Sequence, residues 1–407
     1  MHPVEEPLGR NRDFRALLST QGVSSIGDAV SFTALPLLVF ALTGSGAAMG
    51  VVGALQTLPD LFFGMFAGAL ADRSNRKRMM FIADAGRALL TALIPLSVWL
   101  GGPTLAIILV VAAPMSILRS LFLAGYTASV PAIVGRSQLA RANALFEAVY
   151  STGYIIGPGV AGILSTLIGP GPTLAIDALS FALSALGLLF VRRDLRAPVD
   201  RPRRRLLTEI REGIDFIAAD PTLRTVILFW GATSILLAPL VTSLAVHVTR
   251  DLGEPPSVLG LILASYGVGT VLGSLMTARR IGRGRVAEIL LGGNLVIGLA
   301  LVVVAVSVAT PLQVAAAFVA GIAQSMVLVT YITLRTAYSP DDLLGRIGST
   351  ARSISLGLQP VGLLVGGALI DLTSGSTTIA IIGVAVATIS LVFAPIAAMR
   401  HATVMPR

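Results

Sequence analysis

The sequence predicts an all-α integral membrane protein in which twelve transmembrane helices form two pseudo-symmetric six-helix bundles. Three observations support this prediction: an apolar composition, twelve apolar runs of membrane-spanning length, and motifs that recur between the two halves of the chain. Of the 407 residues, 55% are hydrophobic and only 13% are charged. A soluble globular protein has roughly 25% charged residues, so a chain this poor in charge is typical of a membrane protein.

The twelve runs each approach the roughly 20 apolar residues that a helix needs to cross the hydrocarbon core of a bilayer. Their connections are short and rich in residues that favour turns, such as TGSG at 43–46 and GPGP at 169–172. An even number of spans places both termini on one side of the membrane. The predicted spans are residues 18–42, 47–71, 80–100, 104–126, 144–168, 172–191, 222–247, 257–277, 286–308, 311–334, 349–371 and 377–399.

The distribution of basic residues indicates which side that is. Of the 30 lysines and arginines, 25 lie on one set of connections and the two terminal segments, whereas the opposite connections hold Arg250 alone. Because basic loops stay on the cytoplasmic side, both termini are predicted to be cytoplasmic. The segment MHPVEEPLGRNRDFR lacks the pattern of a signal peptide, so we expect the first span to be retained.

The composition also disfavours several functions. The bases lie between apolar runs rather than in a patch with stacking aromatic residues, so no nucleic-acid partner is expected. The chain has no cysteine, and its three histidines are far apart in the sequence, so no metal site is expected. The chain has no P-loop, and its polar loops are too short to house a catalytic domain, so we expect neither ATP-driven transport nor enzyme activity, and no cofactor.

One long polar interval divides the chain. Residues 1–190 hold six spans, residues 191–221 form a predicted cytoplasmic linker, and residues 222–407 hold the other six. Within the linker, LLTEIREGIDFI has helical periodicity. Gly68 and Gly273 close the second and eighth spans, and each is followed by a basic turn. Paired six-helix halves that rock against each other are a recurrent design of secondary transporters.

The basic turn GALADRSNRKR, residues 68–78, resembles the loop after the second span in the major facilitator superfamily, where a glycine precedes Asp-Arg and further bases. The similarity extends over residues 58–88. SSIGDAVSFTALPLLVFALTGSG at 24–46 and VPAIVGRSQLARANAL at 130–145 resemble the enterobactin-exporter and macrolide-efflux branch. The resemblance covers all twelve spans and implies a transporter, but it does not identify a substrate.

For this turn the resemblance implies a conformational gate formed by Gly68, Asp72, Arg73 and Arg76. Gly68 would let neighbouring helices approach closely, and Asp72 would lie near the positive end of a helix dipole. The two arginines would bridge to carboxylates and hold the outward-open state. Membrane topology alone accounts for the bases, but not for Asp72. Thr277 stands at the equivalent position in the second half, so the gate is expected to be asymmetric.

Ionisable residues inside spans are costly and mark a transport pathway or an ion pair. Asp28 lies about halfway along the first span, where a carboxylate switched by a nearby cation would suit proton-coupled exchange. The alternative is a fixed ion pair between spans, for instance Arg119 with Glu147 or Asp84. The candidate coupling residues are Asp28, Arg119, Asp60 and Glu147.

Two further acidic positions are noted in the first half. Asp84 and Arg87 are three residues apart and share one helical face near the start of the third span. Asp177 lies in the outer part of the sixth span, and we expect it near the lipid headgroups, where ionisation costs little.

The fifth span contains GYIIGPGVAGIL at 153–164, which resembles the glycine-rich motif associated with antiporters. Pro158 can bend the helix because it removes a backbone hydrogen bond. A helix contact between small residues explains the motif equally well. The helix-bending candidates are Gly153, Gly157, Pro158 and Gly162. Candidates for lining a central cavity are Gln56, Gln324, Gln359, Tyr126 and Tyr331, with Met115, Phe229 and Trp230 as further positions that core packing also explains.

These features predict a secondary active transporter that exports a small amphipathic organic molecule, such as a drug, an antibiotic or a siderophore, by alternating access and proton antiport. Its partners would be the substrate, protons and membrane lipid, and it would act as a monomer in the bacterial cytoplasmic membrane. The alternatives are an importer or uniporter without proton coupling, and a non-transporting membrane sensor.

Overall fold

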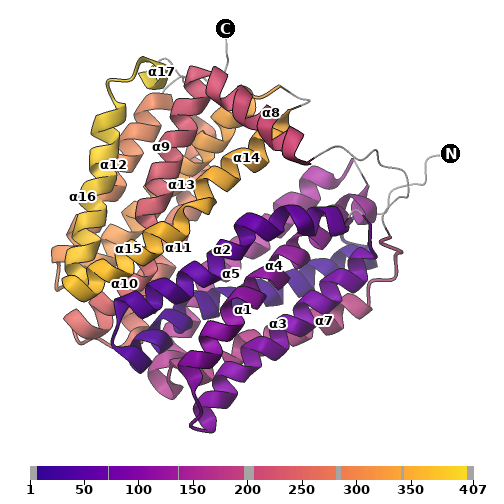
Figure 1. The fold of residues 1–407 in the computed structure, drawn as a ribbon, viewed down its shortest axis with the longest axis horizontal. Helices are drawn as coiled ribbons and strands as arrows, with labels where there is room; N and C mark the ends of the chain where they lie inside the picture. Colours follow the sequence, from indigo (N-terminus) through magenta and orange to yellow (C-terminus); the bar gives the residue numbers. More distant parts are fainter. Residues whose placement is uncertain are drawn as a thin grey trace. The chain divides into compact units, whose positions relative to one another are not determined.

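The computed structural model describes residues 7–71, 73–135, 137–196, 206–280, 286–340 and 343–400, and these residues form helices joined by short turns, with no strand among them (Figure 1). The all-α prediction is therefore confirmed. The elements are α1 (Arg12–Thr43), α2 (Gly46–Ala71), α3 (Arg76–Trp99), α4 (Thr104–Val134), α5 (Leu139–Ile168), α6 (Pro170–Thr173), α7 (Ala175–Leu189), α8 (Leu206–Ala219), α9 (Pro221–Leu237), α10 (Leu240–Val246), the π-helix η1 (His247–Asp251), α11 (Pro256–Arg280), α12 (Val286–Val306), α13 (Thr310–Ala337), α14 (Leu344–Gly357), α15 (Gln359–Leu372), α16 (Gly375–Phe393) and α17 (Ala397–Arg400).

Within the described residues, eleven helical stretches are long and apolar enough to cross a membrane. They coincide with eleven of the twelve predicted spans, and α2, with 26 residues, occupies the position of the predicted second span. Several helices extend beyond the predicted spans; α4, for example, runs to Val134 rather than residue 126. Hydropathy marks the part of a helix that suits lipid, whereas helical hydrogen bonding continues into its polar ends.

Four predicted spans are interrupted: the sixth at Leu174, the twelfth between Phe393 and Ala397, and the seventh and eleventh in their interior. The seventh breaks between Leu237 and Leu240, next to Pro239, and the eleventh breaks at Leu358, just before Pro360. Proline has no amide hydrogen, so a helical hydrogen bond is missing next to each of these two interior breaks. Turns between helices behave as predicted: Gly44 and Gly253, in two of the predicted connections, have φ angles of +63° and +68°, which glycine adopts without strain.

Contacts divide the chain into two compact units. The first unit consists of Met1–Leu42 and Leu55–Arg201, and the second consists of Thr43–Ala54 and Pro202–Arg407. The start of α2 therefore groups with the second unit and the rest of α2 with the first.

In the first unit α3 packs against both α4 and α7. A buried core around Phe14, Met80, Phe122 and Phe146 fills one end of this unit. Lys77 donates hydrogen bonds to the main-chain oxygens at the end of α7, a position at which a cation complements the helix dipole.

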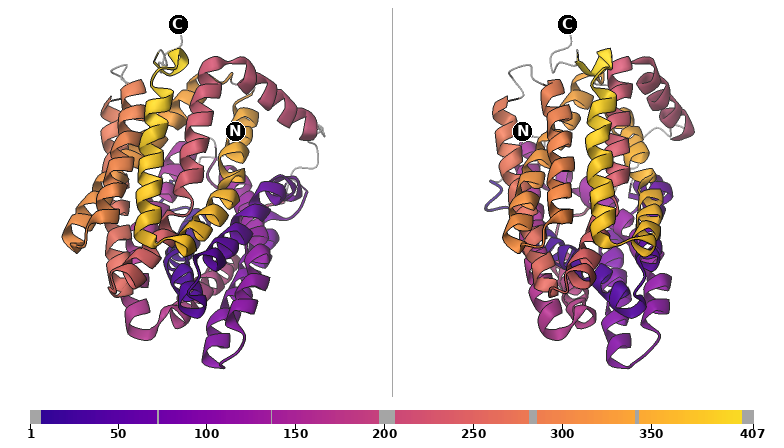
Figure 2. Two further views of the ribbon diagram at one scale, coloured as in Figure 1. Left: turned by 60° about the vertical axis from the view of Figure 1, so that its left-hand side comes forward. Right: turned by 90° about the vertical axis from the view of Figure 1, so that its left-hand side faces the viewer.

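In the second unit α11 packs on α13, and α12 packs on both α13 and α16 (Figures 1 and 2). Figure 2 shows these orange to yellow helices side by side. Glycines allow the close approach: a Cβ atom at Gly273 would lie 2.9 Å from the Cα of Ile322. The predicted helix in the linker is confirmed as α8, which packs on α14 within this unit and forms an ion pair between Glu212 and Arg346.

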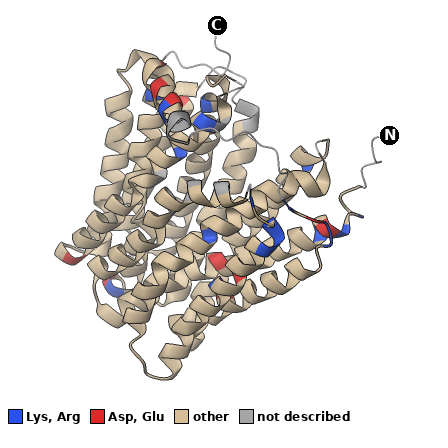
Figure 3. Ribbon diagram, turned by 45° about the vertical axis from the view of Figure 1, so that its right-hand side comes forward, with Lys and Arg blue, Asp and Glu red and all other residues tan. Residues whose placement is uncertain are grey.

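Figure 3 shows that most of the helical ribbon carries no charged residue. Among the described residues, the buried arginine and acidic side chains are Arg76, Asp84, Arg87 and Asp177. All four belong to the first unit, which directs attention to its interior.

Candidate functional site

The candidate site is a cluster of charged side chains from α1, α3 and α7 inside the first unit. Its most accessible member is Asp28 on α1, whose side chain is 33% exposed. Asp28 Oδ1 lies 2.6 Å from Arg87 Nη2 of α3, an ion pair that joins two predicted spans. Arg87 itself is only 4% exposed, so the pair has one buried and one accessible partner.

Arg87 has two further neighbours. Its Nη1 lies 3.4 Å from Oδ1 of Asp84, one helical turn earlier on α3, as the shared face predicted from the sequence requires. Its guanidinium carbon lies 3.7 Å from the centre of the Phe181 ring of α7, a cation–π contact. A guanidinium presents several donors in a fixed plane, so Arg87 can serve two carboxylates and an aromatic face at once.

Asp177 is the third carboxylate of the cluster and corrects a prediction. We expected its ionisation to cost little near the lipid headgroups, but its side chain is buried within the protein, with 2% exposure. Its carboxylate accepts hydrogen bonds from Ser31 of α1 and, at 3.4 Å, from Ser180 of α7. Hydropathy indicates depth along a span and not the direction in which a side chain points, so the sequence did not reveal that Asp177 turns inward.

Small residues bring α5 and α7 close to α1 around Asp28. A Cβ atom at Gly27 would collide with Ser180, and one at Gly153 would lie 2.8 Å from the Ser25 hydroxyl. Gly157 likewise packs on Ala29. Pro158 lies within α5, which is assigned as one continuous helix. The described contacts thus favour the small-residue interpretation of the fifth-span motif, of which Gly162 is also buried.

Aromatic side chains lie beside the accessible face of the cluster. Tyr150 and Tyr154 of α5 have ring centres 4.7 Å apart, and Phe32 of α1 lies 6.1 Å from Tyr154. Tyr150 is 41% exposed and Phe32 is 47% exposed. Phe32 follows Asp28 by about one turn of α1, so the two side chains share a face of that helix. A partly exposed carboxylate next to exposed aromatic faces suits an organic molecule that has both charged and apolar parts.

The other predicted coupling residues lie outside this cluster or outside the described side chains. Arg119 and Glu147 are exposed on α4 and α5, and Asp84, one partner suggested for Arg119, is bonded to Arg87. The side chain of Asp60 lies outside the part of the structure that is described. Sequence reasoning placed Arg87 beside Asp84 but missed its bond to Asp28; the available signal was an arginine inside an apolar span.

The predicted gate is described only in part. Asp72 lies outside the described residues. A Cβ atom at Gly68 would meet no described atom within 4 Å, so the close helix approach expected there is not observed. Arg73 is exposed, whereas Arg76 is 6% exposed and donates to the main-chain oxygens of Ala71 and Ala128 at 3.2 and 2.9 Å.

The predicted lining residues separate into two groups. Tyr126 packs against Phe122 and Phe146 in the core of the first unit, and Phe229 is fully buried against Phe393 in the second. Tyr331 is 2% exposed and stacks on Trp230 with ring centres 5.1 Å apart. Partial exposure is shared by the remaining candidates, Gln56, Gln324, Gln359, Met115 and Trp230.

Two other features of the described residues complete the description. No group of three or more metal-ligating side chains is found among them. An apolar groove of about 690 Å³ is lined by Leu236 and a row of α16 residues that includes Ile381, Val384 and Val392. It holds none of the predicted site residues, and its apolar walls are those of a lipid-facing helix surface.

Comparison with known proteins agrees with this architecture. Solved structures of the nucleoside transporter NupG and of a peptide transporter of the POT family superpose with TM-scores of 0.77 and 0.76 at 14% and 15% identity. The NupG match covers 94% of this chain and 99% of the NupG chain, and the peptide-transporter match covers 99% of this chain and 97% of that chain. At this identity the likeness shows the fold, which is the membrane transporter fold predicted from the sequence.

Curated relatives are similar over most of their length. The multidrug efflux pump Tap of Mycolicibacterium fortuitum is 29% identical over 359 residues, which cover 85% of this chain and 86% of Tap. Tap of Mycobacterium tuberculosis is 27% identical over 395 residues, covering 95% and 93%. The family described as transmembrane secretion effector matches residues 6–406. The chain is thus a multi-pass membrane transporter and not an enzyme, and it belongs to the transmembrane secretion effector family of the major facilitator superfamily.

Proposed function

We propose that this transporter exports a small amphipathic organic molecule across the bacterial cytoplasmic membrane in exchange for protons, with both termini in the cytoplasm. The observation that carries the proposal is the Asp28–Arg87 pair, which combines one accessible carboxylate with one buried guanidinium. Asp84 contacts the same guanidinium, and a third carboxylate, Asp177, is buried one turn of α7 before Phe181, which also contacts Arg87. One positive charge cannot balance three negative charges in a poorly solvated interior, so proton uptake by a carboxyl group relieves the imbalance.

The proposed exchange follows from this charge arrangement. With a proton on Asp28, the ion pair weakens and the substrate leaves; without the proton, Asp28 is charged and its accessible side attracts a cationic part of the substrate. The exposed faces of Tyr150 and Phe32 supply contact for its apolar part. The efflux role of the relatives named Tap supports export as the direction. We also propose that the transporter acts as a monomer in the lipid bilayer. A single chain already supplies both of the units that alternating access needs.

The test is transport in proteoliposomes with an imposed pH gradient, using a panel of amphipathic organic cations and neutral analogues. We expect accumulation in vesicles with an acidic lumen, and Asp28→Asn is expected to abolish its dependence on the gradient. Glu147→Gln, which removes an exposed carboxylate from α5, is the matched control and should keep it.

Three outcomes contradict the proposal in different ways. Substrate transport at a rate that does not depend on the pH gradient indicates a uniporter. Accumulation of substrate only on the side of the membrane that carries the two termini indicates an importer. No movement of any probe by well-folded protein favours a membrane sensor.

A further inference from the structure

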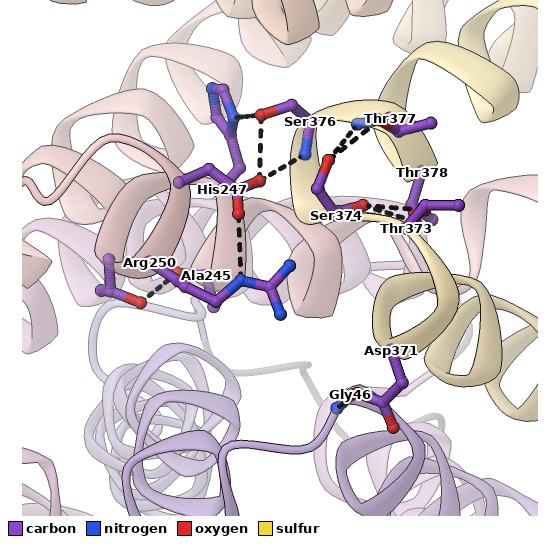
Figure 4. Close-up of polar contacts among 12 residues, drawn as sticks. Gly46, Ala245, His247, Arg250, Asp371, Thr373, Ser374, Ser376, Thr377 and Thr378 are labelled. Carbon is purple, nitrogen blue, oxygen red and sulfur yellow. Dashed lines mark hydrogen bonds and ion pairs between the residues drawn. The ribbon is translucent and has the colours of Figure 1, made fainter.

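At the far end of α15, Asp371 binds the beginning of α2 (Figure 4). Its Oδ1 accepts a hydrogen bond from the Gly46 amide at 2.5 Å. Its Oδ2 accepts from the Ala47 amide at 2.9 Å and from the Ser45 hydroxyl at 2.7 Å. These residues are more than 320 positions apart in the sequence, and all of them belong to the second unit.

Asp371 completes the hydrogen bonding of the first turn of α2. The first four amides of a helix have no partner within the helix. Here the first two bind Asp371, and the next two bind Ser45, one at its hydroxyl at 3.2 Å and one at its carbonyl at 3.4 Å. A carboxylate at this position also complements the positive end of the helix dipole. Removing Asp371 would leave two amides without a protein partner.

Glycines let the two helices meet backbone to backbone below this contact. A Cβ atom at Gly50 would lie 2.5 Å from the carbonyl oxygen of Leu363, and one at Gly367 would lie 3.1 Å from the Cα of Gly50. A Cβ atom at Gly53 would lie 3.1 Å from the Leu363 side chain. Residues Ser45–Gly53 and Leu363–Asp371 thus form one continuous contact, which we call the outer seam.

The turn after Asp371, between α15 and α16, is hydrogen-bonded to another part of the second unit. The amide and hydroxyl of Ser376 donate to Asp251 Oδ2 at 2.7 and 2.9 Å, and the same hydroxyl lies 2.7 Å from His247 Nδ1 (Figure 4). The other ring nitrogen of His247 lies 3.0 Å from the amide nitrogen of Gln313. The turn between α15 and α16 is therefore anchored to the seventh and tenth spans, and Asp371 projects from a fixed base.

The start of α2 is held in the second unit by its contacts across the outer seam. Thr43–Ala54 groups with that unit through the outer seam, whereas the same helix continues from Leu55 into the first unit. Motion of the two halves during transport must therefore either open the seam or bend α2. The Asp371 side chain is exposed, so water competes for its hydrogen bonds and the contact can open and close repeatedly.

We propose that Asp371 is a latch that keeps the outer side of the transporter closed, and that the outer seam parts when the protein opens outward. The basic connections place the ends that meet here on the outer side. The sequence-predicted gate has Asp72 at the inner end of the second span, and Asp371 stands at the outer end of the eleventh. The second and eleventh spans would thus carry one carboxylate at the inner end of the pair, Asp72, and one at the outer end, Asp371.

The test exploits the absence of cysteine from the chain. Single reporters Met49→Cys, at a site that is 3% exposed, and Gln56→Cys, about two turns deeper in α2, are labelled in cells with a membrane-impermeant maleimide. Adding Asp371→Ala is expected to raise both labelling rates about 3- to 10-fold, the range that follows from losing a helix-capping side chain. Asp371→Asn should give a smaller rise.

Glu254→Gln removes another exposed carboxylate from an outer connection and is expected to leave both rates unchanged. Size-exclusion chromatography of each variant checks folding. If the labelling rate rises at Met49→Cys alone, Asp371 only caps α2. If the labelling rate rises at neither site, Asp371 does not keep the outer side closed. Either result contradicts the proposed latch. Labelling needs neither substrate nor a pH gradient, so this outcome is independent of the transport assay for Asp28.

Discussion

The two units differ in the kind of polar side chain that they bury and in how it is stabilised. In the first unit, Arg87 pairs with Asp28 and Asp84, and a third carboxylate, Asp177, is buried one turn of α7 before Phe181, which contacts Arg87. In the second, a neutral side chain is central: Asn294 is fully buried, accepts from Thr233 at 3.4 Å and donates to the Val386 carbonyl at 3.1 Å. Neutral hydrogen bonds pin helices without a change of charge, whereas a cluster with excess carboxylates can respond to protons.

The same contrast appears in the repeated glycines. Gly273 lies against the backbone of α13, whereas its counterpart Gly68 has no described atom near the position of a Cβ atom. The second copy of the motif is therefore used for packing. The first copy makes no such packing contact with the described atoms, and its role in a gate stays a prediction.

The largest expected effect is that of Arg87→Leu. It leaves Asp28 and Asp84 without their cation, and we expect the free energy of unfolding to fall by about 3–5 kcal/mol, as for other broken buried ion pairs. Thermal unfolding in detergent measures the loss. The double variant Arg87→Leu/Asp28→Asn should recover part of it; equal loss in both variants would contradict a role for Arg87 as the charge partner of Asp28.

Next in size is Gly273→Ala in the second unit. The added methyl group would lie 2.9 Å from the Cα of Ile322, and overpacking of this kind costs about 1–3 kcal/mol. The matched variant is Gly68→Ala, which is expected to be neutral or stabilising by up to about 1 kcal/mol, because alanine favours helix over glycine. Equal destabilisation by both substitutions, measured by thermal unfolding, would remove the distinction between the two copies.

A smaller effect is expected for Asn294→Leu. It leaves the Thr233 hydroxyl and the Val386 carbonyl with fewer partners, and interhelical hydrogen bonds in membranes contribute about 0.5–2 kcal/mol. Stability should fall by that amount, while any dependence of transport on the pH gradient should persist. Loss of that dependence in a well-folded variant would place coupling in the second unit as well.

The smallest effect is expected for Glu147→Gln. This carboxylate is exposed on α5, and surface substitutions of this kind change stability by less than about 0.5 kcal/mol. Thermal unfolding and pH-gradient-driven transport should both match the parent protein. A large change in either would restore Glu147 to the coupling machinery that the sequence suggested.

Parts of the site were accessible from the sequence and parts were not. Asp28 was singled out because an acid halfway along an apolar run is costly wherever it points. Its partner was not identified, since Asp28 and Arg87 are 59 residues apart and several cations were available in other spans. The burial of Asp177 was missed for a related reason: its depth can be estimated by counting, but its direction depends on how α7 is rotated against α1.

The sequence by itself determined the properties that belong to single segments: which runs suit lipid, where glycine and proline end or interrupt helices, and on which side the basic turns collect. Only the tertiary structure decided the pairings, namely Asp28 with Arg87, Asp177 with Ser31, and Asp371 with the first turn of α2. The physical reason is that hydropathy and turn propensity are local, whereas a contact between helices depends on their rotation, spacing and register. In this chain those are set by glycines packed against distant backbone.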